Sequence, residues 1–222
     1  MRLINILPLL PLSALGAPTD SDADQLDKRQ VYGVTSKYCS TASGGLCYLQ
    51  YFVSQNSPTY RIAIPSDATQ NSAYDVVLQV IAPNALGWAG FAWGGSMINN
   101  PLTVVWPNGQ SGQATASSRW ANSRTLPTVY TGATLKTLSS SRNGTHWSVE
   151  VACTGCSKWN NRGLNLNGPS TFSWAFSTNQ VQNPGNSGSS FAVHTSSGVF
   201  SQPLDYGKNT KTVFTNYINK KP

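Results

Sequence analysis

Few side chains in this sequence of 222 residues could bind a metal, and methionine and histidine are the scarcest of them. Met97 is the only methionine besides the initiator, and His146 and His194 are the only histidines. A methionine fills gaps in a core more often than it binds a soft metal ion, and a lone histidine is usually a hydrogen-bonded structural residue. From the residues alone, Met97 and His194 are therefore either structural residues or metal ligands.

The segment that leads to Met97 is predicted to be a strand with two different faces. Read with a period of two, one face carries small residues beside one tryptophan, and the other is aromatic. The first face consists of Trp88, Gly90, Ala92 and Gly94, and the second of Ala89, Phe91 and Trp93. The aromatic face suits a core, whereas the nearly bare face would let a flat group approach the backbone.

The two histidines have different surroundings. Alternation in residues 145–151 puts His146 on the same side as Ser148 and Glu150, away from the core, so we expect His146 to be a solvated surface residue. His194, if its segment is extended, shares a face with the small residues Ala192 and Ser196. Like Met97, it would therefore project from a surface that carries mostly small side chains.

The cysteines are even in number, and all four are expected to form disulfides. Cys39 and Cys47 enclose a serine- and glycine-rich turn, so we expect them to staple a hairpin. Cys153 and Cys156 form a Cys-x-x-Cys motif that could in principle be redox-active or half of a zinc site. Without a second such motif or a thioredoxin-like pattern, a local structural disulfide is favoured.

The N-terminal segment is predicted to be removed on secretion. Residues 1–16 combine an early arginine, an apolar run too short to cross a bilayer and small residues at the end, as in a signal peptide. Residues 17–29 are acidic and end at Lys28-Arg29, which indicates a propeptide. The remaining domain, residues 30–222, would carry 12 basic and 4 acidic residues, a net charge of +8.

Several function classes are disfavoured by the composition. The small number of carboxylates argues against a glycosidase with paired acids. Scattered basic residues in an exported chain argue against a nucleic-acid-binding protein. After residue 16 no apolar run approaches the length that spans a membrane. Serine-hydrolase, phosphate-loop and dinucleotide motifs are absent.

The domain is predicted to be all-β, a sandwich of two antiparallel sheets. Short segments rich in β-branched and aromatic residues alternate with turn sequences. The predicted strands cover residues 60–64, 74–82, 86–94, 102–106, 145–152, 172–176 and 191–194. Helical structure is expected only near residues 213–218, and residues 179–190 are expected to form a surface loop. Asn143 lies in an N-glycosylation sequon at a turn.

Six segments in a fixed order carry a resemblance to a known family. They are Gly94-Gly95-Ser96-Met97, Ser118-Arg119-Trp120-Ala121, Pro127-Thr128-Val129-Tyr130-Thr131-Gly132, Cys153-Thr154-Gly155-Cys156 with Trp159-Asn160, Phe172-Ser173-Trp174-Ala175-Phe176-Ser177, and Phe191-Ala192-Val193-His194-Thr195. Together they resemble the cytochrome domain of fungal cellobiose dehydrogenase, a heme-binding branch of the DOMON group. The resemblance covers most of residues 30–222 and is strongest from Gly87 to His194.

The resemblance implies an immunoglobulin-like sandwich that holds one heme b. By motif, the iron ligands fall on Met97 and His194. Other expected heme contacts are the pocket walls Trp88 and Trp93 and the propionate partners Arg124 and Tyr130. With both axial positions filled, no open site remains on the iron. The implied role is electron transfer by a hemoprotein, rather than catalysis in a substrate pocket of its own.

The resemblance also suggests partners. In that family the domain is usually joined to a flavin dehydrogenase, and we find no flavin-binding half in this sequence. We therefore expect a free-standing, extracellular monomer that takes electrons from a separate flavin dehydrogenase or a small reductant. Expected acceptors are ferric iron, a quinone or a copper lytic polysaccharide monooxygenase in plant cell wall degradation. The alternative is a heme-free DOMON-type sandwich that binds carbohydrate through exposed aromatic residues such as Trp106, Trp120 or Trp159.

Overall fold

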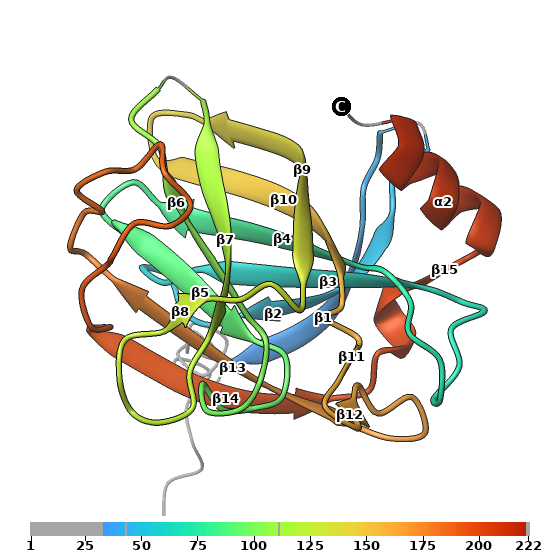
Figure 1. Ribbon diagram of the computed structural model, residues 1–222. Helices are drawn as coiled ribbons and strands as arrows, with labels where there is room; N and C mark the ends of the chain where they lie inside the picture. Colours follow the sequence, from blue (N-terminus) through green and yellow to red (C-terminus); the bar gives the residue numbers. More distant parts are fainter. Residues whose placement is uncertain (1–32, 43, 111, 221–222) are drawn as a thin grey trace, which may run out of the picture. The chain divides into compact units, whose positions relative to one another are not determined.

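The computed structural model describes residues 33–42, 44–110 and 112–220, all within the unit formed by residues 32–222. The predicted signal peptide and propeptide, residues 1–29, lie outside the described residues. Two antiparallel sheets enclose the main apolar core (Figure 1). The prediction of an all-β sandwich is confirmed.

The first sheet has seven strands in the order β1-β2-β3-β4-β10-β9, with β15 beside β3. Its strands are β1 (Val34–Cys39), β2 (Cys47–Phe52), β3 (Thr59–Pro65), β4 (Val76–Pro83), β9 (Thr134–Arg142), β10 (His146–Thr154) and β15 (Lys208–Asn209). Strands β1 and β2 pair so that Cys39 lies opposite Cys47, and a disulfide joins the two cysteines as predicted. The disulfide thus links the two strands of the hairpin at the residue pair next to the turn.

The second sheet has six strands in the order β14-β13-β5-β6-β7-β8. Its strands are β5 (Trp88–Ala92), β6 (Leu102–Pro107), β7 (Ala114–Trp120), β8 (Thr128–Val129), β13 (Ser170–Ser177) and β14 (Ser196–Gln202). A separate short hairpin consists of β11 (Lys158–Trp159) and β12 (Arg162–Gly163). Strand β6 pairs with β5, the strand that leads to Met97, and β7 pairs with β6 on the side away from β5.

One predicted strand is wrong. Residues 191–194 do not pair with a neighbour, and the ladder with β13 begins only at Ser196. The reason is that Phe191 turns onto the outer face of the second sheet, where its ring lies 5.0 Å from that of Trp88. The segment that carries His194 is therefore a loop that crosses a sheet face.

The two predicted faces of the segment before Met97 are confirmed. Ala89, Phe91 and Trp93 belong to the core between the sheets, whereas Trp88 and Ala92 belong to a cluster on the outer face of the second sheet. Alternation along β5 thus separates a closed aromatic interior from an outer surface that other segments cover only in part.

A helix covers the outer face of the first sheet. Helix α2 (Lys211–Lys220), which follows a short 3₁₀ turn η1 (Asp205–Gly207), packs there through Phe214. No helix in the described part of the chain is long and apolar enough to cross a membrane. The helix confirms the predicted helical structure near residues 213–218.

The helix also covers Glu150 on the outer face of the first sheet. Alternation correctly puts Glu150 on the outer face of β10, but the residue is only 1% exposed. It accepts hydrogen bonds from the hydroxyls of Tyr48 at 2.5 Å and Tyr217 at 2.6 Å. Burial and the bond to Glu150 raise the pKa of Tyr217 to about 12.

Candidate cofactor site

A cavity of about 670 Å³ lies on the outer face of the second sheet. Ligand pockets in proteins are typically about 300–1,000 Å³. Strands β5 and β13 contribute Gly90, Ala92 and Ala175 to its lining, and Trp88 stands beside them. The nearly bare face predicted from the sequence therefore faces a space large enough for a cofactor.

Met97 lies in a loop just after β5, and buried Asn100 holds that loop in place. The Asn100 side-chain amide donates hydrogen bonds to the carbonyls of Ser96 and Ile98, both at 3.0 Å, and accepts one from Trp159 Nε1 at 3.2 Å. The two carbonyls flank Met97 in the chain. One amide side chain therefore fixes the backbone on both sides of the methionine.

His194 belongs to the long loop between β13 and β14. Its neighbour Phe191 is 8% exposed and packs against the rings of Trp88 and Trp106. The backbone N–H of Thr195 then donates to the carbonyl of Phe176 at 2.8 Å, just before β14 begins. Exposed His194 thus follows a buried ring in the chain and precedes the start of β14.

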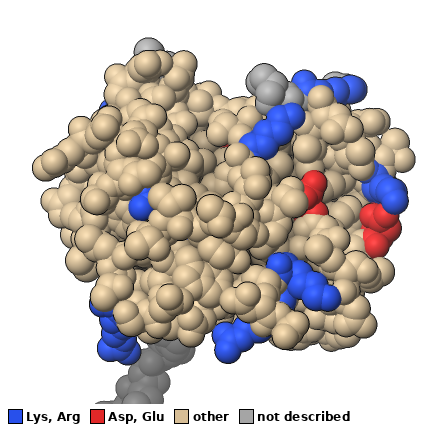
Figure 2. Space-filling model, viewed as in Figure 1, with Lys and Arg blue, Asp and Glu red and all other residues tan. Residues whose placement is uncertain are grey.

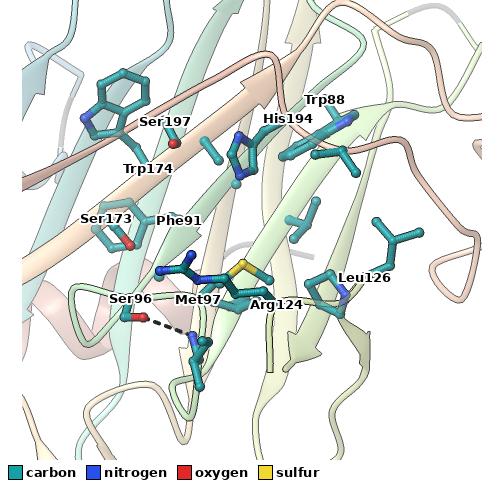
Figure 3. Close-up of a pocket in the computed structure, with 18 of the residues that line it drawn as sticks. Trp88, Phe91, Ser96, Met97, Arg124, Leu126, Ser173, Trp174, His194 and Ser197 are labelled. Atoms are coloured by element: carbon teal, nitrogen blue, oxygen red, sulfur yellow. Dashed lines mark hydrogen bonds between the residues drawn. The ribbon is translucent and has the colours of Figure 1, made fainter. Parts of the chain in front are cut away.

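The structure brings Met97 and His194 to the same cavity. Both line it, and in Figure 3 the sulfur of Met97 and the imidazole of His194 lie on opposite sides of the open space. The two residues come from different loops, one after β5 and one before β14. Their convergence is a consequence of the sheet, because β5 and β13 are hydrogen-bonded neighbours.

The other residues expected at the pocket separate into two groups. Trp88 and exposed Arg124 line the cavity. Trp93 does not, because alternation turns it into the core, where Nε1 donates to Thr103 Oγ1 at 3.0 Å. Tyr130 is not among the lining residues either, and its ring stacks on that of Trp120 at 4.8 Å.

The donors and the lining suit a heme. A thioether and an imidazole that face one space are donors found at the axial positions of cytochrome iron. The outer cluster around the cavity is apolar, with Leu102, Val104 and Phe191 beside Met97. The buried Trp88 Nε1 has no hydrogen-bond partner in the described part of the chain. The space is therefore apolar, bordered by two axial-type donors, and retains an unused N–H group in its wall.

The remaining sequence predictions concern residues away from the cavity. Cys153 and Cys156 form a disulfide as expected, and both are at most 1% exposed, which agrees with a structural role. His146 is half-buried, and its Nδ1 lies 2.9 Å from Thr145 Oγ1. Asn143 is exposed in the turn between β9 and β10.

The tryptophans expected to bind carbohydrate are mostly inaccessible. Trp106 is 0% exposed and Trp159 is 6% exposed, so neither can stack on a sugar. The prediction fails for Trp106 because Trp106 Nε1 donates to Pro184 O at 2.8 Å under the long loop. It fails for Trp159 because that side chain supports Asn100. Only Trp120 is half-buried, and one of its neighbours is the stacked Tyr130.

Comparison with known proteins identifies the class to which this fold and cavity belong. Residues 38–212 match the family model of the cytochrome domain of cellobiose dehydrogenase. The chain belongs to this family of heme-binding, electron-transferring domains.

Individual relatives agree with the family. The chain is 27% identical over 180 residues to the pyrroloquinoline quinone-dependent pyranose dehydrogenase of Coprinopsis cinerea, and the match covers 79% of this chain but 24% of that protein. The crystal structure of the cytochrome b domain of pyranose dehydrogenase from the same fungus superposes with a TM-score of 0.75 at 24% identity, covering 85% of this chain and 98% of that one. The cytochrome domain of Myriococcum thermophilum cellobiose dehydrogenase gives 0.75 at 23%, covering 86% and 97%. The chain thus has the fold of an isolated cytochrome domain and spans about a quarter of its curated relative.

Proposed function

We propose that this protein is a secreted b-type cytochrome in which Met97 and His194 ligate a heme iron from opposite walls of the cavity. The observation that carries this proposal is that both side chains, distant in sequence, line one apolar cavity on a nearly bare sheet face. Membership of a heme-binding family supports the choice of cofactor. Met97 and His194 would hold the heme iron through sulfur and imidazole, and the heme would supply one-electron redox chemistry rather than a binding site for substrate.

The residues of the chain would bind the cofactor and keep water from it. Trp88 and Phe191, whose rings lie 5.0 Å apart, would pack against the macrocycle and exclude solvent from the iron. Arg124 is exposed at the cavity, where its guanidinium could pair with a heme carboxylate. Because Tyr130 is absent from the lining, Arg124 alone remains our candidate for a propionate partner.

We further propose the expected partners. The domain over residues 30–222 would act outside the cell as a monomer, after removal of residues 1–29. It would accept electrons from a separate dehydrogenase or a small reductant and pass them to ferric iron, a quinone or a copper lytic polysaccharide monooxygenase. Figure 2 shows Lys and Arg side chains scattered over one face with few acids between them, which suits weak docking to an acidic partner.

A visible spectrum of the protein, purified after production with added heme, tests the proposal. We expect a Soret band that shifts on reduction. Met97→Leu, which keeps the volume but has no sulfur, and His194→Ala should each lose heme or change the spin state. His146→Ala is the matched control, since it alters the only other histidine and should leave the spectrum unchanged. A colourless wild-type protein, or a His194→Ala variant with a wild-type spectrum, would contradict the proposal.

A further inference from the structure

A buried arginine lies behind one wall of the cavity. Arg119 in β7 is 3% exposed, although it carries a full positive charge. Its hydrogen-bond acceptors are all neutral oxygens of the described chain. They are Ser117 Oγ at 2.6 Å, Pro127 O at 3.3 Å, Ser187 O at 2.7 Å and Ser189 O at 2.6 Å. A charge buried among neutral acceptors is costly and therefore calls for a functional reason.

The oxygens that Arg119 binds come from the two loops that border the cavity. Pro127 ends the loop that contributes Arg124 and Leu126 to the lining. Ser187 and Ser189 belong to the loop that continues to His194. One rigid guanidinium thus fastens both loops to a strand, which a flexible ammonium group cannot do with the same geometry.

The loop that carries His194 depends on such fastening because strand pairing does not hold it. From β6 and β7, Trp106 Nε1 and Thr115 Oγ1 donate to Pro184 O, at 2.8 and 2.5 Å. Ser117 Oγ donates to Ser187 O at 2.6 Å, next to the two bonds from Arg119 Nη2. The anchors nearest to His194 on its N-terminal side are therefore those made by Arg119 and the buried ring of Phe191.

Phe191 connects the arginine to the cavity. The guanidinium carbon of Arg119 lies 5.3 Å from the centre of the Phe191 ring, and the same ring lines the cavity. A single buried ring thus separates the charge from the space that would hold the cofactor. In this setting solvent screens a charge weakly. A nearby cation disfavours the more positive oxidation state of the iron.

We propose that Arg119 is a positioning residue that holds the loop carrying His194 against β7. Through its buried charge, Arg119 also favours the reduced form of the bound cofactor. The second part rests on the proposed heme site. The first part concerns the protein alone and is testable without the cofactor.

Two substitutions separate the roles of geometry and charge. Arg119→Gln removes both the charge and the planar guanidinium, whereas Arg119→Lys keeps the charge but loses the planar set of donors. Arg142→Gln is the control, since Arg142 is exposed on β9 and donates to Asn84 Oδ1 at 3.0 Å. Hydrogen exchange of the heme-free protein is measured first. We expect exchange about tenfold faster or more at the amides of Ser189 and Thr195 in both Arg119 variants, because bonds to a charged donor are lost. Exchange in β3 and β4 should not change.

Heme titration and potentiometry complete the test. Both Arg119 variants should bind heme about tenfold more weakly than Arg142→Gln. At a fixed potential, Arg119→Gln should show a lower ferrous-to-ferric ratio, and Arg119→Lys a ratio near that of wild type; a tenfold change in this ratio corresponds to about 59 mV. Wild-type exchange at Ser189 and Thr195 in both variants would overturn the anchoring role, and equal potentials in Arg119→Gln and wild type would overturn the charge effect. A wild-type protein that never binds heme would refute the proposed function, while the exchange experiment would still decide the anchoring role.

Discussion

Replacing Asn100 by alanine should loosen the loop that carries Met97. Asn100 is 3% exposed and makes three side-chain hydrogen bonds, two to the carbonyls of Ser96 and Ile98 and one from Trp159 Nε1. The substitution removes all three bonds at once. Its effect should therefore appear both in the stability of the fold and in the binding of heme.

The size of the effect follows from where each partner lies. The bond from Trp159 Nε1 is buried, so its loss leaves a donor without water and costs about 1–3 kcal/mol. Ser96 is exposed and Ile98 half-buried, so water can replace the amide at their carbonyls, and each lost bond costs about 0.5 kcal/mol. We expect a total of about 2–4 kcal/mol, a large fraction of the roughly 5–15 kcal/mol that stabilises a domain.

Urea unfolding of the heme-free protein measures this cost, with an unchanged m-value as the check that one transition is compared. The matched control is Asn165→Ala, because Asn165 is exposed and its side chain also bonds to backbone groups, Pro169 O at 3.4 Å and Asn167 N at 3.0 Å. The control should lose less than about 1 kcal/mol, since water reaches its partners. Equal losses in the two variants, or undiminished heme affinity in Asn100→Ala, would refute the reasoning.

Three further predictions follow from packing, titration and charge. A Cβ on Gly94 would overlap the Asn100 amide and lie 2.9 Å from Trp159 Cζ2, so Gly94→Ala should lower the free energy of unfolding by about 1–3 kcal/mol. The control Gly144→Ala, whose Cβ would have nothing within 4 Å, should be nearly neutral in the same urea assay. Because the pKa of Tyr217 is raised, the folded state keeps a proton that the unfolded state loses above pH 10. The contribution of Tyr217 to the free energy of unfolding is therefore complete below pH 10 and is lost towards pH 12. Urea unfolding across this range should show a shallower fall in stability for Tyr217→Phe than for wild type. Electron transfer to an acidic acceptor should slow as ionic strength rises, in stopped-flow measurements, and a rate independent of salt would contradict docking by charge.

Local sequence patterns determined part of the fold. Segments rich in β-branched and aromatic residues between turns predicted six of the sandwich strands, namely β3, β4, β5, β6, β10 and β13. Period-two alternation predicted both faces of the segment before Met97, because alternation along a strand is a property of the backbone. The disulfide between Cys39 and Cys47 followed from an even cysteine count and a turn between the pair. The family followed from six short segments in order, which is a property of sequence alone.

Only the tertiary structure decided what lies on each face. Alternation put Glu150 outside the first sheet, but it could not show that helix α2 covers that position. It likewise could not show that residues 191–194 leave the ladder, or that the long loop buries Trp106. The supporting roles of Asn100 and Arg119 escaped prediction for the same reason. A side chain's direction follows from the local backbone, whereas its burial and partners depend on segments distant in sequence that only the folded chain brings to it.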